Sequence, residues 1–242
     1  MISNNIPKVI HYCWFGGNPL PPLARKCIES WKKYLPNYEI KEWNESNFNF
    51  NSCQYAREAF EQKKWAFVSD YARFKILYEN GGLYFDTDVE LINSIDDILE
   101  KGPFMAIESG VNVAPGLGLA ANIGLSLYKT ILDIYHSMTF MNEDGSMNQT
   151  TIVYYTTEIL KQHGLKDSKE IQSVEGINIY PKDYFCPLDY KTGKMHKTKN
   201  TRAIHHYTQS WKTGYEKFIY KIKHLMGPKI SQYISKLMHG KK

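Results

Sequence analysis

Short apolar runs alternate with amphipathic stretches along most of this 242-residue chain, and that alternation limits the fold more than any other feature. Apolar runs bounded by glycine or proline are typical of buried strands, whereas apolar residues spaced three and four positions apart are typical of helices. We expect strands within residues 6–17, 38–43, 83–85, 103–108, 176–181 and 202–207, and helices over 21–36, 67–81, 122–138 and 150–163. This order predicts an α/β fold, with a mostly parallel sheet flanked by helices and ligands bound at the carboxyl ends of the strands.

The length fits one sizeable domain that needs no disulfide or structural metal. We place this domain at residues 1–212 and a helical tail at 213–242. The cysteines are scattered without zinc-site spacing, which indicates reduced, buried thiols: Cys13, Cys27, Cys53 and Cys186. The first residues lack the features of a secretory signal and no apolar run is long enough to span a bilayer, so we expect a cytoplasmic location.

The positive charge is concentrated in the tail. Residues 215–242 contain seven lysines and one glutamate, a net charge of +6, whereas the whole chain carries +5 and residues 1–214 therefore carry −1. Apolar residues recur at helical spacing among these lysines, which is compatible with two small helices packed on the domain. The localised charge favours helices that lie on an anionic membrane surface, on the inner face of the membrane. The rest of the chain has no basic stripe, so no nucleic-acid partner is expected.

Two acidic residues follow the third predicted strand. Asp86 and Asp88 come directly after the apolar run 83–85, which itself follows two glycines. Side chains two positions apart in a strand share one face, with Cα atoms roughly 6.6 Å apart. Carboxylates this close repel each other unless a cation lies between them, and their hard oxygen atoms suit Mg²⁺ or Mn²⁺ completed by substrate phosphates. An isolated Asp-Thr-Asp is more often a solvated turn, but the preceding buried strand favours a ligand site.

Three blocks of sequence resemble a known family. These are "IPKVIHYCWFGG", "AFVSDYARFKILYENGGLYFDTDVE" and "IHHYTQSW", which together span Ile6 to about Trp211. They resemble the retaining glycosyltransferases of the capsular-polysaccharide and Och1-like mannosyltransferase group, which are related to the glucosylating domain of large clostridial toxins. The resemblance implies a GT-A fold, a single nucleotide-binding α/β domain, and a metal-dependent hexosyltransferase.

The resemblance also implies roles for residues near the donor. Trp14 matches the position that stacks on the nucleotide base, with Cys13 beside it, although Trp14 could also be a core residue of the first strand. Asp70 and Arg73 match positions that hold the sugar hydroxyls and the diphosphate, with Ser69 beside them. By spacing alone, Asp70 and Arg73 would be a surface pair on one helix face.

The last block implies further ligands. Of the adjacent His205 and His206, at most one can face the site, because neighbouring strand residues point to opposite sides. We choose His206 as a third metal ligand beside Asp86 and Asp88, and we expect Ser210 and Trp211 in a loop that closes over the donor.

The resulting hypothesis is transfer of a sugar from a nucleotide-sugar donor with retention of anomeric configuration, in surface polysaccharide synthesis. A UDP-sugar is favoured over GDP-mannose, because the block around Trp14 is most similar to the toxins, and the acceptor would be a saccharide or a lipid-linked oligosaccharide. Asp70, Arg73, Asp86 and Asp88 are the expected catalytic residues. The alternatives are a glycoside hydrolase, which also uses two carboxylates, and a non-catalytic carbohydrate-binding module, which would use the 18 tyrosines for stacking.

Overall fold

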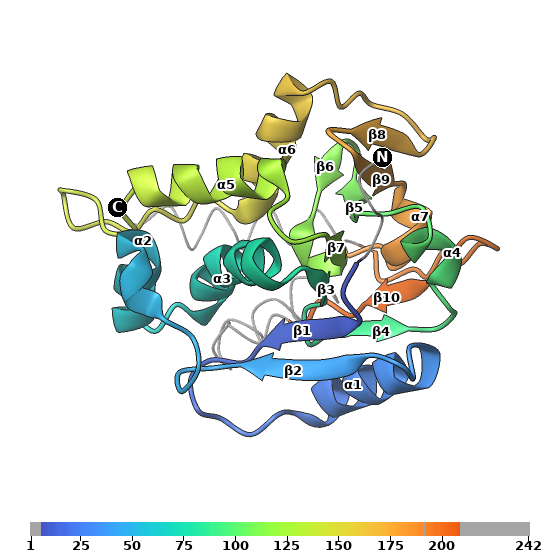
Figure 1. The fold of residues 1–242 in the computed structure, drawn as a ribbon, viewed down its shortest axis with the longest axis horizontal. Helices are drawn as coiled ribbons and strands as arrows, with labels where there is room; N and C mark the ends of the chain where they lie inside the picture. Colours follow the sequence, from blue (N-terminus) through green and yellow to red (C-terminus); the bar gives the residue numbers. More distant parts are fainter. Residues whose placement is uncertain (1–5, 191, 209–242) are drawn as a thin grey trace.

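A computed structural model describes residues 6–190 and 192–208 (Figure 1). Its main sheet has the strand order β2-β1-β3-β7-β5-β9-β8, with β6 paired to β5. The pairings make β1, β2, β3, β5 and β9 run in one direction, with β7 and β8 opposed. The strands of this sheet are β1 Val9–Cys13, β2 Glu39–Trp43, β3 Gly82–Tyr84, β5 Phe104–Ser109, β6 Asn112–Val113, β7 Leu119–Ala121, β8 Gln172–Val174 and β9 Ile177–Tyr180.

Helices cover both faces of this sheet. Figure 1 shows α2, α3 and α5 gathered on one side, whereas α1 packs on the other side against β4. The described helices are α1 Pro22–Tyr34, α2 Gln54–Glu61, α3 Trp65–Asn80, α4 Asp96–Leu99, α5 Ser126–Ser137, α6 Ile152–Gln162 and α7 Lys182–Phe185, with 3-10 turns η1 Phe50–Ser52 and η2 Pro115–Leu117. The fold is thus α/β with a mostly parallel central sheet flanked by helices, as the alternation predicted.

The strand sequences explain why both faces are covered. Along β3 and the residue after it, Leu83 and Phe85 belong to the core cluster on the α1 side, whereas Tyr84 belongs to the cluster on the α3 side. A strand that places apolar side chains on both faces must be buried on both, which is typical of parallel sheets.

The structure differs from the sequence-based expectation at the last strand. Residues 202–207 were expected to join the central sheet, but β10 (Ala203–His205) pairs antiparallel with β4 (Val89–Leu91) in a separate two-stranded sheet. The pairing is long-range and connects residues more than a hundred positions apart, so no local pattern could indicate it. It places the residues after β10 beside Asp88, whose carbonyl oxygen accepts a hydrogen bond from the backbone N–H of His206 at 2.9 Å.

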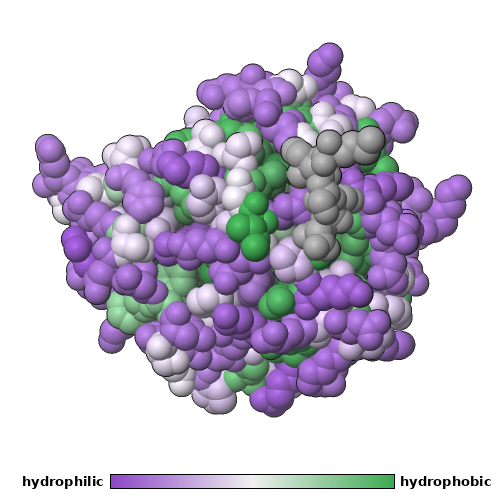
Figure 2. Space-filling model, viewed as in Figure 1, coloured by the Kyte–Doolittle hydropathy of each residue, from purple (hydrophilic) through white to green (hydrophobic). Residues whose placement is uncertain are grey.

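The surface of the described residues is mainly polar. Figure 2 shows one face, which is largely hydrophilic with small separate hydrophobic areas. Among the described residues, the large hydrophobic side chains that are most exposed are Ile123, Tyr154, Ile171 and Met195. No helix in the described part of the chain combines the length and the apolar character needed to cross a membrane. The predicted basic tail lies outside the described residues.

Candidate active site

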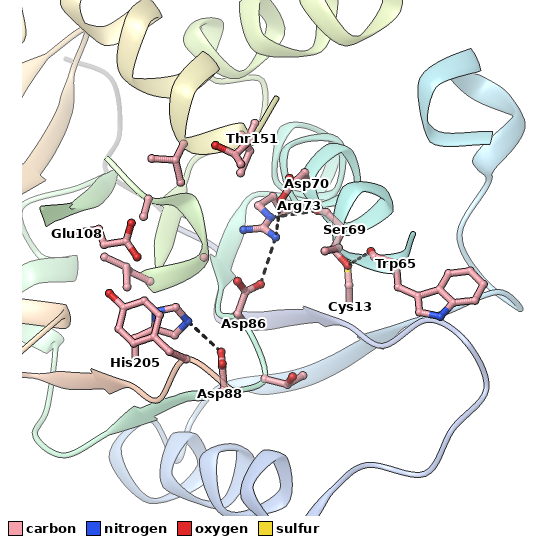
Figure 3. Close-up of a pocket in the computed structure, with 18 of the residues that line it drawn as sticks. Cys13, Trp65, Ser69, Asp70, Arg73, Asp86, Asp88, Glu108, Thr151 and His205 are labelled. Atoms are coloured by element: carbon pink, nitrogen blue, oxygen red, sulfur yellow. Dashed lines mark hydrogen bonds and ion pairs between the residues drawn. The ribbon is translucent and has the colours of Figure 1, made fainter. Parts of the chain in front are cut away.

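A pocket of about 870 Å³ opens at the edge of the sheet where the parallel strands end (Figure 3). Its lining includes Cys13 at the end of β1, Asp86 and Asp88 after β3, Glu108 near the end of β5, and Lys182 after β9. Because the carboxyl ends of parallel strands meet at one edge, residues distant in sequence converge there. The volume lies within the range typical of sites that bind small molecules and cofactors.

Two glycines allow the turn that delivers Asp86 to this edge. α3 ends at Gly81, which has φ of +64°, and Gly82 follows with φ of +93°. A Cβ atom on Gly82 would lie 2.6 Å from the carbonyl oxygen of Val9 on the neighbouring strand β1. Glycine is therefore required both for the left-handed backbone and for the close approach of β1.

Asp70, Arg73 and Asp86 form a buried ion-pair network at the centre of the pocket wall (Figure 3). The Nη2 atom of Arg73 lies 3.0 Å from Oδ1 of Asp70 and 3.3 Å from Oδ1 of Asp86. Burial raises the pKa of Asp70 to about 6, although Arg73 and the backbone N–H of Ile152 act in the opposite direction. The arginine therefore joins α3 to the segment after β3 and fixes two of the predicted site carboxylates.

Asp86 occupies a tight slot. The hydroxyl of Tyr84 donates a hydrogen bond to Oδ1 of Asp86 at 3.0 Å, and the backbone N–H of Asp86 donates to the carbonyl of Gly116 at 3.2 Å. A Cβ atom on Gly116 would lie only 2.1 Å from Oδ2 of Asp86. The absence of a side chain at Gly116 thus makes room for the Asp86 carboxylate.

Asp88 is held by the segment around β10. Oδ1 of Asp88 lies 3.2 Å from Nε2 of His205, and Oδ2 accepts hydrogen bonds from the backbone N–H and the hydroxyl of Thr208 at 2.8 and 2.9 Å. Burial alone would raise the pKa of Asp88, but the charge and hydrogen bond of His205 and the two bonds from Thr208 lower it well below its usual range. Burial and the nearby Asp88 raise the pKa of Asp86, which Arg73 opposes. The two carboxylates therefore differ in their pKa, as close acidic pairs do.

The structure places His205 rather than His206 in the pocket, which corrects the choice made from the sequence. His205 lines the pocket beside Asp88, whereas Nε2 of His206 contacts Oε2 of Glu90 at 2.8 Å and its side chain is not part of the lining. In the register of β10 with β4, His205 is paired with Val89. Because neighbouring strand residues point to opposite sides, only one of the two histidines could face the site, and the register of β10 with β4 decided which one.

The residues predicted to hold the nucleotide lie at one end of the pocket. Cys13, Trp14 and Ser69 all line it. The indole N–H of Trp14 donates to the carbonyl of Asn18 at 2.5 Å, and the side chain is only partly buried. Burial raises the pKa of the Cys13 thiol to about 12, so this cysteine is an uncharged wall residue at neutral pH. Stacking of a base on Trp14 stays a prediction.

Several lining residues were not singled out from the sequence. Phe15 and Trp65 flank the end that contains Trp14, and Gly116 supports Asp86. Trp65 begins α3 two residues before the helix expected from the sequence. Gly16 leaves room for Trp65, because a Cβ atom on Gly16 would lie 2.7 Å from Nε1 of Trp65, and no local pattern in the sequence indicated this contact. Ser210 and Trp211 lie outside the described residues.

Asp86 and Asp88 are the residues that fit a divalent cation. Both carboxylates line the pocket and both are partly exposed, with 29% and 14% of the side chain accessible. The described residues contain no group of three or more His, Cys, Asp or Glu side chains arranged to hold a metal ion. Mg²⁺ and Mn²⁺ often take only one or two carboxylates and complete their coordination with phosphate oxygens, so the pair fits a cation bound together with a diphosphate.

One family model matches the part of the chain that contains the two carboxylates. Residues 21–105 match the family described as "Glycosyltransferase sugar-binding region containing DXD motif". That range includes Asp70, Arg73, Asp86 and Asp88.

A curated relative and a solved structure were also found. The chain is 27% identical over 151 residues to "Uncharacterized glycosyltransferase L373" of Acanthamoeba polyphaga mimivirus, a match that spans 60% of this chain and 60% of that relative's length. The structure is similar to "PaToxG Glycosyltransferase", with a TM-score of 0.51 and 20% identity over 65% of this chain and 69% of the other. The last likeness shows a fold of the glycosyltransferase GT-A type. The matched family and this relative are both described as glycosyltransferases.

Proposed function

We propose that this chain is a metal-dependent hexosyltransferase that moves a sugar from a nucleotide-sugar donor to a saccharide or lipid-linked oligosaccharide. A UDP-sugar is favoured over GDP-mannose, and the reaction belongs to surface polysaccharide synthesis such as capsule formation. One observation carries the proposal: Arg73, Asp86 and Asp88 converge on one large pocket at the carboxyl ends of the strands. That is where α/β folds bind nucleotides.

The donor is proposed to lie with its base near Trp14 and Trp65 and its diphosphate near Asp86 and Asp88. Aromatic side chains at this end offer flat apolar faces to a base. Asp70 and Arg73, on the inner wall, are proposed to hold the donor sugar and the diphosphate side. Both are buried, with 9% of Asp70 and 4% of Arg73 exposed, and they form an ion pair with each other. Preorganised groups of this kind orient a substrate without further loss of side-chain entropy.

A divalent cation bound between Asp86 and Asp88 would neutralise negative charge that develops on the leaving diphosphate. Arg73 supports this site by keeping the Asp86 carboxylate in its slot beside Gly116. His205 and Thr208 do the same for Asp88. The chain contributes fixed charges and dipoles rather than a nucleophile, in keeping with retention of configuration through attack from the face of the leaving group.

The test is a panel of UDP- and GDP-sugars incubated with the full chain and Mn²⁺, with release of UDP or GDP as the readout. A sugar nucleotide must be consumed, and EDTA must stop the reaction. Asp88→Asn should also abolish turnover while the protein stays folded, with a lower thermal unfolding midpoint because the amide loses the charge that faces His205 but can still accept a bond from Thr208. Asp133→Asn, an exposed carboxylate on α5, is the matched control.

The alternatives predict other results. A glycoside hydrolase would cleave glycosides in water and leave every sugar nucleotide intact. A carbohydrate-binding module would bind sugars and turn over neither class of compound. Near-normal turnover of Asp88→Asn in Mn²⁺ would remove this residue from the metal site.

The basic tail is proposed to hold the enzyme on an anionic membrane surface, on the cytoplasmic side. The charge of +6 over residues 215–242 supports this, because each lysine near such a surface contributes on the order of 1 kcal/mol. A location at the membrane would bring the active site close to lipid-linked acceptors.

A further inference from the structure

The pocket extends well beyond the residues assigned to the donor. Its far end is lined by five residues that the donor proposal does not use, and we call them the β5–β9 subsite: Glu108, Lys182, Asp189, Tyr190 and Tyr207. Figure 3 shows Glu108 on the opposite side of Asp86 and Asp88 from Cys13 and Trp65. In the sheet, β5 is separated from β1 by β3 and β7, so the two ends are roughly 14 Å apart at the usual strand spacing.

Glu108 lines the pocket at an irregularity of the sheet. The pairing of β5 with β6 shifts register between Ile107 and Ser109, so Glu108 lies at a bulge. Bulges re-aim side chains and are frequent beside functional sites. Glu108 is only partly buried, and Figure 3 shows its carboxylate directed toward the cavity. The carboxylate is therefore placed to accept hydrogen bonds from a molecule in the pocket.

Tyr207 adds an aromatic surface next to Glu108. It is one of three non-glycine residues with positive φ among the described residues, at +51°, a backbone conformation that costs free energy and recurs at functional sites. Its ring lies 5.0 Å from that of Tyr190 and 4.1 Å from that of His205. Its hydroxyl lies 2.9 Å from Sγ of Cys186 and also hydrogen-bonds to Glu108. Rings thus line the wall continuously from Tyr190 to His205, which contacts Asp88.

We infer that the β5–β9 subsite binds the acceptor, and that the acceptor group there is a pyranoside. The inference rests on the proposed function. A pyranose ring offers hydroxyl groups that donate to the Glu108 carboxylate and an apolar face that packs on Tyr190 and Tyr207. A purely apolar acceptor would remove water from Glu108 and Lys182 without supplying new hydrogen bonds, which is unfavourable.

The placement is consistent with the chemistry of transfer. The bond from the anomeric carbon to the leaving diphosphate oxygen breaks, and its electron pair stays on the diphosphate. The acceptor hydroxyl oxygen forms the new bond to the anomeric carbon, and its proton passes to the leaving diphosphate. A glycoside held by Glu108 lies on the far side of Asp86 and Asp88 from the base, so its hydroxyl can reach the anomeric carbon next to the diphosphate. Glu108 is a positioning residue in this scheme.

The experiment measures glycoside binding and transfer separately. Methyl α- and β-glycosides of glucose, galactose, mannose and N-acetylglucosamine serve as probes. Their binding to the full chain is followed by saturation-transfer NMR in the presence of UDP and Mn²⁺. Transfer is followed with the donor selected from the sugar-nucleotide panel. The variants are Glu108→Gln and Tyr190→Ala, and the matched controls outside the pocket are Glu61→Gln, on the exposed end of α2, and Tyr154→Ala, at an exposed tyrosine.

At least one glycoside should bind, and Glu108→Gln should raise its KM or Kd by about fivefold or more, because the amide oxygen still accepts a hydrogen bond but lacks the charge that strengthens it. The affinity for UDP should stay within about twofold of wild type, because the base and diphosphate bind at the other end. The inference is overturned if no glycoside binds, or if the two subsite variants match their controls. If wild type binds a glycoside and the variants do not, but no sugar nucleotide is turned over, the subsite is supported and the proposed function is refuted.

Discussion

Gly116→Ala provides a sharp test of how Asp86 is held. The new methyl group would lie 2.1 Å from Oδ2 of Asp86, whereas ordinary contact begins at 3.4 Å. The carboxylate or the backbone must therefore move by more than about 1 Å, a displacement that costs about a hundredfold in rate at a catalytic centre. The Asp86 carboxylate is already 3.3 Å from Arg73, so this shift also strains or breaks the ion pair.

The expected destabilisation is about 1–3 kcal/mol, the usual cost of an extra methyl group in a packed region. Gly116 is suited to the test because its φ lies outside the left-handed range, so alanine adds volume without backbone strain. The assay is urea unfolding of Gly116→Ala, Asp86→Ala and the double variant. Because Asp86→Ala removes the atom that the methyl group meets, Gly116→Ala should cost little stability in that background, and the cycle should show a coupling of similar size.

Gly145→Ala is the control. Gly145 has φ of +80°, and a Cβ atom added there would meet no other atom within 4 Å. Alanine at this position therefore adds backbone strain alone and should show no coupling with Asp86→Ala. Additive free energies for Gly116→Ala and Asp86→Ala, together with unchanged turnover of the selected sugar nucleotide, would refute the account of the slot.

Three further predictions concern the donor, the pH dependence and the tail. Trp14→Ala should weaken UDP binding by about 1–3 kcal/mol in calorimetry, because a stacking contact with the base is lost. Asp70→Ala should mainly reduce turnover and discrimination between sugars. If Trp14→Ala binds UDP and GDP with unchanged affinity, Trp14 is not part of the site. Burial lowers the pKa of His11 to about 4 from 6.5, so the unfolded chain takes up a proton first as the pH falls. The contribution of His11 to stability should then fall by up to about 3 kcal/mol between pH 6.5 and 4, whereas the raised pKa of Asp70 acts in the opposite direction over this range. Urea unfolding of wild type and His11→Gln isolates the contribution of His11, and equal pH dependence of the two proteins contradicts it. Full-length protein should float with anionic vesicles at low salt and be released at high salt. A truncated chain ending at Lys212 should stay in solution and still turn over donor. Equal partitioning of the two proteins would show that the tail does not bind the membrane.

Local patterns in the sequence determined the main architecture. The period of apolar residues indicated α1, α3, α5 and α6 and most of the parallel strands, because each of these elements buries a face that its own sequence defines. The pair of glycines at the end of α3 and the apolar run after them placed Asp86 and Asp88 at an edge where a ligand can bind. These features belong to one continuous stretch of sequence, so they could be predicted without knowledge of any tertiary contact.

Tertiary structure decided what surrounds the two carboxylates. His205 faces Asp88 because β10 pairs with β4 in a register that no local pattern specifies. Gly116 supports Asp86 because the chain before β7 returns to the end of β3, and Glu108 faces Tyr207 because the end of β5 lies beside the segment after β10. Each of these placements depends on a contact between separate segments, and the free energy of such contacts is set by packing in three dimensions rather than by the periodicity of either segment.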